Sequence, residues 1–171
     1  REERDSSHIS IVGAATVDGK ALKPMLLSIN QNPSPEIRGT WLEGTFEWFQ
    51  TPKGYMNHDS MIAWMRKILF PYINEQRVSL GNQGLPALLI MDGLKAHLMN
   101  DIANELTQNN VLTVCLPAHS SHLLQVLDLS IFGPMKLYYR NAKSKLFENS
   151  NRKMAKKIEK IINSFYHATY M

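Results

Sequence analysis

The sequence predicts an α/β fold in which a mixed sheet is flanked by helices. Two patterns carry this prediction. Near the start of the chain, β-branched residues alternate on both sides of an Asp-Gly pair, which predicts an antiparallel β-hairpin over residues 8–29. Later, short apolar runs alternate with segments of helical periodicity. Antiparallel strands followed by strand-helix-strand units are typical of a mixed sheet with helical layers.

The hairpin consists of two apolar runs, residues 8–15 and 22–29, joined by a turn at Asp18 and Gly19. The next stretch, residues 38–55, is rich in aromatic residues and glycine and has no clear period. We interpret it as a short strand or an irregular cover for the sheet.

A helix is predicted over residues 57–70 because the apolar residues there fall on one helical face. Asn57 or Asp59 is the candidate N-cap, and Pro71 is expected to lie near the end of the helix because proline disrupts helix interiors. The apolar positions of this face are Met61, Trp64, Met65, Ile68 and Leu69. A polar connection over residues 74–86 is expected to follow.

Residues 87–148 are predicted to form a strand-helix-strand-helix core. Residues 87–91 read as a buried strand that ends directly before Asp92, and a helix over residues 94–108 leads to a second buried strand at residues 111–116. An amphipathic segment with Asp128 follows. Its helix is expected to start late or distorted because it contains Gly133 and Pro134.

Asp92 and Asp128 are candidate ligands of a divalent metal ion. A strand-helix-strand connection places neighbouring strand ends side by side, so both carboxylates can reach one edge of the sheet. Taken singly, each acid is explained at least as well as a helix N-cap. The pair is therefore what points to a metal site.

The last part of the chain is predicted to be a basic helix over residues 152–166. Its lysines and arginines, together with those of the preceding helix, suit contact with a phosphate backbone, but they suit a solvated helix face equally well. Both alternatives stay open. These basic residues are Lys136, Arg140, Lys143, Lys145, Arg152, Lys153, Lys156, Lys157 and Lys160.

The composition is that of a globular protein. The chain has 171 residues, of which 44% are hydrophobic and 20% charged, and we expect a single domain over residues 1–171. A net charge of +4 permits a polyanionic partner without requiring one. The lone cysteine, Cys115, excludes an internal disulfide and is expected to be a small core residue. No apolar run is long enough to span a bilayer, so we expect no membrane partner.

Two motifs resemble a known family. LLIMDGLKAH at residues 88–97 and LPAHSSHLLQVLDLSIFGPMKLYY at residues 116–139 are similar to the DDE superfamily endonuclease domain of pogo and Tigger transposases, which also includes centromere protein B and jerky-like proteins. The resemblance covers nearly the whole chain. It implies a ribonuclease-H-like fold and a metal-dependent DNA endonuclease. In it, Asp92 and Asp128 match the family's second and third metal-binding acids.

The resemblance also implies cofactors and partners. These are Mg²⁺ or Mn²⁺ as a pair of ions about 3.5 to 4 Å apart, DNA as the partner and the nucleus as the location. No small-molecule substrate is expected, and a homo-oligomer is left open. Candidate DNA-contacting residues are His97, His122, Lys136, Arg140 and Lys143.

The chain departs from the family pattern in three ways. The family's first acid lies on a strand before the hairpin, and the given chain begins beyond that point. Ala96 replaces a usual serine, and Val126 replaces a usual proline. We therefore expect a sheet without its first, central strand. Since only two acids match, we expect little DNA cleavage by this chain alone, and leave open whether the protein is an enzyme.

Two functional hypotheses follow. The first is a transposase-derived nuclease domain that binds DNA and is inactive as this fragment. The alternative is a domesticated, non-catalytic module that binds DNA or protein, in the manner of centromere protein B. A weaker third hypothesis is an α/β domain without a nucleic-acid role, and salt-dependent DNA binding would argue against it.

Overall fold

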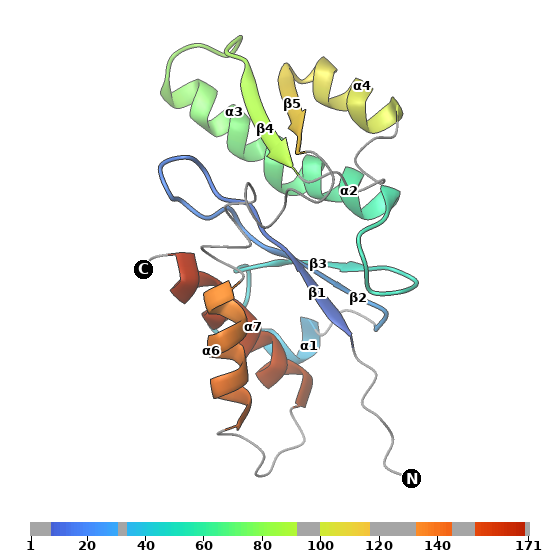
Figure 1. The fold of residues 1–171 in the computed structure, drawn as a ribbon, viewed down its shortest axis with the longest axis vertical. Coiled ribbons are helices and arrows are strands. Elements are labelled where there is room, and N and C mark those ends of the chain that lie inside the picture. Colours follow the sequence, from blue (N-terminus) through green and yellow to red (C-terminus); the bar gives the residue numbers. More distant parts are fainter. Residues whose placement is uncertain (1–7, 31–33, 92–99, 117–132, 145–152, 170–171) are drawn as a thin grey trace. The chain divides into compact units, whose positions relative to one another are not determined.

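The structure is a computed structural model, and it describes residues 8–30, 34–91, 100–116, 133–144 and 153–169. It is a mixed α/β protein with small sheets and helices (Figure 1). The chain divides into two compact units. The first unit comprises Arg1–Met56 with Ser130–Met171, and the second comprises Asn57–Leu129. The expectation of a single domain stays a prediction.

The first unit contains a three-stranded sheet in the order β1-β2-β3, formed by β1 (Ile9–Val12), β2 (Met25–Ser28) and β3 (Glu47–Gln50). β1 and β2 pair antiparallel, as the alternating pattern predicts. Their connection turns at Gly19, whose φ of 86° suits glycine. β3 adds in parallel to the other side of β2, and the sequence did not specify this pairing.

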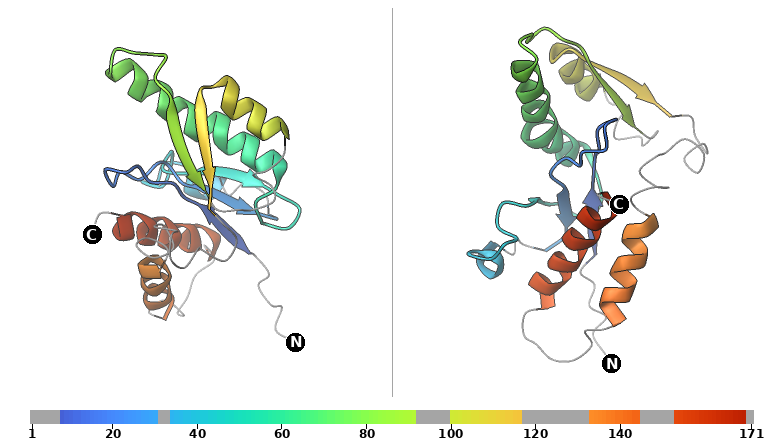
Figure 2. Two further views of the ribbon diagram at one scale, coloured as in Figure 1. Left: turned by 45° about the horizontal axis from the view of Figure 1, so that its top comes forward. Right: turned by 90° about the vertical axis from the view of Figure 1, so that its left-hand side faces the viewer.

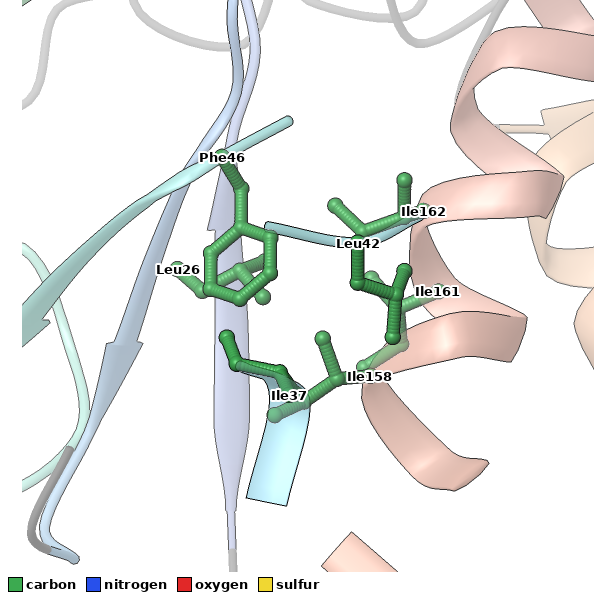
Figure 3. Packing of buried hydrophobic residues seen from close by; sticks show 7 residues of the cluster. All are labelled: Leu26, Ile37, Leu42, Phe46, Ile158, Ile161 and Ile162. Atoms are coloured by element: carbon green, nitrogen blue, oxygen red, sulfur yellow. The ribbon is translucent and has the colours of Figure 1, made fainter. Parts of the chain in front are cut away.

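Among its described residues, the same unit contains the helices α1 (Ser34–Ile37), α6 (Gly133–Ser144) and α7 (Lys153–Thr169). α7 falls in the region predicted to be a basic helix, and its apolar side is buried in a cluster with the sheet (Figure 3). All four residues of β2 are buried, so this strand lies at the centre of the core. The buried cluster consists of Leu26, Ile37, Leu42, Phe46, Ile158, Ile161 and Ile162.

The second unit begins with one continuous helical segment made of α2 (His58–Trp64), the π-helical turn η1 (Met65–Leu69) and α3 (Phe70–Ser79). Asn57 is its N-cap. The Asn57 side chain accepts a hydrogen bond from the Ser60 amide (2.9 Å), and the Ser60 hydroxyl accepts one from the Asn57 amide (2.8 Å).

The predicted end of this helix near Pro71 is wrong, because the helix continues to Ser79. The amide of Phe70 donates to the carbonyl of Met65, which is the wider spacing of a π-helix. In a regular α-helix the Pro71 ring would meet the carbonyl of Lys67. The wider turn directly before Pro71 lets the helix pass through the proline.

The strand-helix-strand prediction corresponds to β4 (Ala87–Met91), α4 (Asn100–Gln108) and β5 (Val111–Cys115), with residues 92–99 outside the described part of the chain. β4 and β5 pair in parallel, from Ala87 opposite Val111 to Met91 opposite Cys115. α4 contributes two fully buried side chains, Ile102 and Leu106.

The prediction that β4 and β5 are buried is wrong for one face of β4 and for every residue of β5 after Val111. Leu88 and Ile90 of β4, with Leu112 and Val114 of β5, are exposed, and we call these four residues the open face. Cys115 is also exposed rather than a core residue. The open face is exposed because α3 and α4 lie on the same side of the strand pair (Figure 2). Apolar runs indicate strands, but they do not specify whether both faces are covered.

Candidate metal and nucleic-acid site

The carboxyl ends of β4 and β5 lie next to each other. The parallel register ends with Met91 opposite Cys115, and the amide of Leu116 donates to the carbonyl of Met91 (2.8 Å). In open α/β sheets, ligands bind outside the carboxyl ends of such strands. This edge of the strand pair is therefore the place where the sequence motifs predict a site.

The four acidic and histidine candidates lie outside the described residues, so their convergence stays a prediction. They are Asp92, His97, His122 and Asp128. For Asp92, the structure locates the preceding residue. Asp92 follows Met91 directly in the sequence, and Met91 is the last residue of β4.

The basic candidates belong to α6. Lys136 is an exposed residue of this helix. Arg140 and Lys143 follow four and seven residues later on the same helix, which places the three positions on one helical face. The side chains of Arg140 and Lys143 lie outside the described part. Of these three candidates, Lys136 is the one that the structure describes, and its exposure would let it contact a phosphate backbone.

Two carboxylates fit a hard cation by their chemistry. Mg²⁺ and Mn²⁺ prefer oxygen ligands, and Mg²⁺ usually retains several waters, so Asp92 and Asp128 suffice to hold one ion weakly. Among the described residues, no group of three or more His, Cys, Asp or Glu side chains is arranged to hold a metal ion.

Arg77 holds the opposite, amino ends of the same two strands. Its side chain is only 8% exposed. Nε donates to the carbonyl of Leu85 (2.8 Å), just before β4, while Nη2 donates to the carbonyls of Asn109 (3.0 Å) and Asn110 (3.1 Å), just before β5. One guanidinium thus fixes where both strands begin, and hence the register that brings their carboxyl ends together.

Sequence reasoning missed this role of Arg77, since it placed the residue in a polar connection. Its partners along the strands are main-chain carbonyls, which every residue type carries, so no pairing motif marks them. The nearest signal is Asn110, whose φ of 53° marks a sharp turn that asparagine tolerates.

In the parts that the structure describes, no helix combines the length and hydropathy needed to cross a bilayer. A similar protein is the MFS-type transporter clz9 of Cochliobolus lunatus, with 26% identity over 135 residues. The match covers 77% of this chain but 14% of that protein, so the transporter name describes the relative alone. No solved structure matches the chain significantly.

The family comparison is far more extensive. Residues 7–168 match the family described as DDE superfamily endonuclease, which is nearly the whole chain and includes both acidic motifs and all the described strands. This chain therefore belongs to the DDE superfamily endonuclease family.

Proposed function

We propose that this chain is the nuclease domain of a pogo- or Tigger-type transposase-derived protein, with a ribonuclease-H-like fold, that binds DNA in the nucleus. In this proposal Asp92 and Asp128 are ligands of Mg²⁺ or Mn²⁺. The residues in contact with DNA are His97, His122, Lys136, Arg140 and Lys143. By itself, the chain cleaves DNA weakly or not at all.

The observation that carries the proposal is the alignment of the carboxyl ends of β4 and β5, with Asp92 following β4 directly in the sequence. Family membership supplies the chemistry. When bound, a divalent ion would polarise a phosphate oxygen and lower the pKa of a bound water. The low expected activity rests on the count of motif-matched acids in this chain, which is two.

A second candidate is a non-catalytic module that binds DNA or protein, in the manner of centromere protein B. Ala96 and Val126 favour it, since both depart from the family motif close to the matched acids. The open face also favours it, because it offers four exposed apolar side chains on neighbouring strands.

DNA binding by the full chain tests the shared part of both proposals. We expect binding of duplex DNA, followed by fluorescence anisotropy, to weaken steeply between about 50 and 200 mM salt, because phosphate contacts release counterions. Lys136→Ala should lower the salt slope by about one charge. Lys53→Ala, at another exposed lysine of the same unit, is the matched control and should leave the slope unchanged. Equal slopes in both variants, or no salt-dependent binding, would contradict the DNA-binding role of α6.

The metal separates the two candidates. Binding of Mn²⁺, followed by electron paramagnetic resonance, should be weak in the parent chain and lost in Asp92→Asn if the acids still form a site. No Mn²⁺ binding would favour the non-catalytic module. Plasmid nicking in the same samples should be slight. Robust nicking that disappears in Asp92→Ala would overturn the expectation of an inactive chain.

A further inference from the structure

α4 is held on the helix α2-η1 by an apolar strip with an ion pair at each end. Ile102 and Leu106 of α4 are fully or almost fully buried. One residue before each of them is an acid, Asp101 and Glu105. Both acids bond to basic side chains of the other helix, His58 and Arg66, so the interface has two polar attachments one turn apart.

The two attachments differ in the cation. Glu105 accepts hydrogen bonds from Nε (2.7 Å) and Nη2 (3.2 Å) of Arg66, and a guanidinium stays charged at every physiological pH. Asp101 pairs instead with Nε2 of His58, and histidine changes its charge near neutrality. Near neutral pH, therefore, the attachment at the start of α4 is the one of the two that can change its charge.

His58 is placed to be an imidazolium. Nε2 faces Asp101, while Nδ1 lies 3.2 Å from a carboxylate oxygen of Asp59. A neutral ring has one N–H, so it can donate to only one of these acids, whereas the imidazolium donates to both. The same arrangement argues against a metal, since a ligating nitrogen must be free of a proton.

The other ionisable groups on the described elements that form this contact can be named. The ionisable groups of the packed elements are Asp59 on α2, Arg66 and Lys67 on η1, and Asp101 and Glu105 on α4. Arg66 is bound to Glu105. The positive end of the α2 dipole opposes a cation at His58. The hydrogen bonds to Asp59 and Asp101 outweigh the desolvation of the ring and raise the pKa of His58.

We propose that His58, Asp59 and Asp101 form a proton-sensitive clamp that fixes the first turn of α4 on α2, and that the clamp loosens when His58 loses its proton. α4 is the first described element after Asp92 in the chain. The proposal concerns described residues only and does not depend on the proposed DNA function.

The clamp works within a defined pH window. Because the pKa of His58 is raised on folding, its contribution is complete below the ordinary histidine value of about 6.5 and is lost as the pH rises through the folded pKa. The hydrogen bond from His58 lowers the pKa of Asp101, so its contribution is complete above about pH 4 and is lost as the pH falls through the folded pKa. The clamp is thus closed between about pH 4 and 6.5.

The test follows the full chain by nuclear magnetic resonance between pH 5.5 and 8.5. The His58 ring, assigned by its absence in His58→Gln, should titrate above the ordinary histidine pKa. Amide exchange at Ile102 to Leu106, corrected for intrinsic rates, should become about two- to fivefold faster as His58 deprotonates, the size expected for an exposed ion pair. Amides of β2 should show no such step.

Two variants separate the clamp from general loosening of α4. Asp101→Asn should bring the pKa of His58 back towards its ordinary value and remove the pH step in exchange. Arg66→Gln should speed exchange of α4 by a similar factor at every pH while leaving the step in place. A His58 pKa at or below about 6.5, or exchange in the parent chain with no step, would overturn the proposal.

Discussion

The two small sheets contain similar apolar strands, but their environments differ. In the first unit every residue of β2 is buried, and Leu26 is fully enclosed by the cluster that includes three isoleucines of α7 (Figure 3). In the second unit the open face leaves Leu88 62% exposed. A leucine on a strand therefore stabilises the fold in one sheet and contributes little in the other.

The difference arises from the neighbours of each strand. β2 lies between β1 and β3, so both of its edges are paired. β4 has β5 as its one neighbour among the described strands, and α3 and α4 cover one side of the pair. At the amino ends of this strand pair, Arg77 donates hydrogen bonds to the main chain before both strands. The first sheet is thus packed through a fully buried central strand, whereas the second is packed on one side and held at its amino ends by hydrogen bonds from Arg77.

The largest effect is expected from matched leucine substitutions in the two sheets. Leu26→Ala should lower the free energy of unfolding by about 2 to 5 kcal/mol, because it removes buried methyl groups and leaves a cavity. Leu88→Ala should change it by less than about 0.5 kcal/mol, since the side chain is largely in water. Urea unfolding of both variants measures the difference. Equal losses would show that the open face is covered in solution.

The next effect concerns the base of β4 and β5. Arg77→Met keeps much of the side-chain volume but removes the side-chain donor of the carbonyls of Leu85 and Asn109, so we expect a loss of about 2 to 3 kcal/mol. The carbonyl of Asn110 keeps the amide of Ala87 as a donor (3.1 Å). Amide exchange should accelerate in β4 and β5 and stay unchanged in β1 and β2.

Arg66→Gln is the matched control for Arg77→Met, because Arg66 is an exposed arginine of the same helical segment. It should leave exchange in β4 and β5 unchanged. If both variants loosen the strand pair equally, Arg77 does not have the anchoring role that its contacts indicate.

The parts of the fold that the sequence predicted are those that local pattern controls. Alternation around Asp18 and Gly19 predicted the hairpin, and Asn57 carried a recognisable capping signal. The helix end at Pro71 was wrong, because a π-helical turn accommodates the proline and this depends on packing. The parallel addition of β3 was not predicted, since pairing partners are set by tertiary contacts.

The candidate site was predictable to the extent that motifs carry it. The motifs pointed to the ends of β4 and β5, and the described register brings these ends together, although the two acids lie beyond the described residues. The contacts that hold the region were invisible in the sequence. Arg77 donates to main-chain carbonyls, which no particular residue type marks in the sequence. His58 pairs with Asp101, which lies 43 residues later in the chain.

The smallest effect is expected at the edge of the first sheet, where Gly54 contacts His8 and Ser10. Gly54 has a φ of 71°, and a Cβ there would lie 3.3 Å from both Cδ2 and the main-chain oxygen of His8. Its carbonyl also accepts a hydrogen bond from the hydroxyl of Ser10 (2.6 Å), a β1 residue that pairs with Leu27 of β2. Gly54→Ala therefore combines backbone strain with crowding of the edge strand.

Gly44→Ala separates these two costs. Gly44 has a similar φ of 79°, but a Cβ there would meet nothing within 4 Å, so the substitution should cost about 1 kcal/mol from the backbone alone. Gly54→Ala should cost up to about 2 kcal/mol, because the main-chain oxygen of His8 must shift as well. Thermal unfolding of the two variants gives the difference. If the two substitutions lower the free energy of unfolding equally, the main chain at His8 moves aside without cost. In that case the first sheet is held mainly through β2 and the buried cluster, not through its β1 edge.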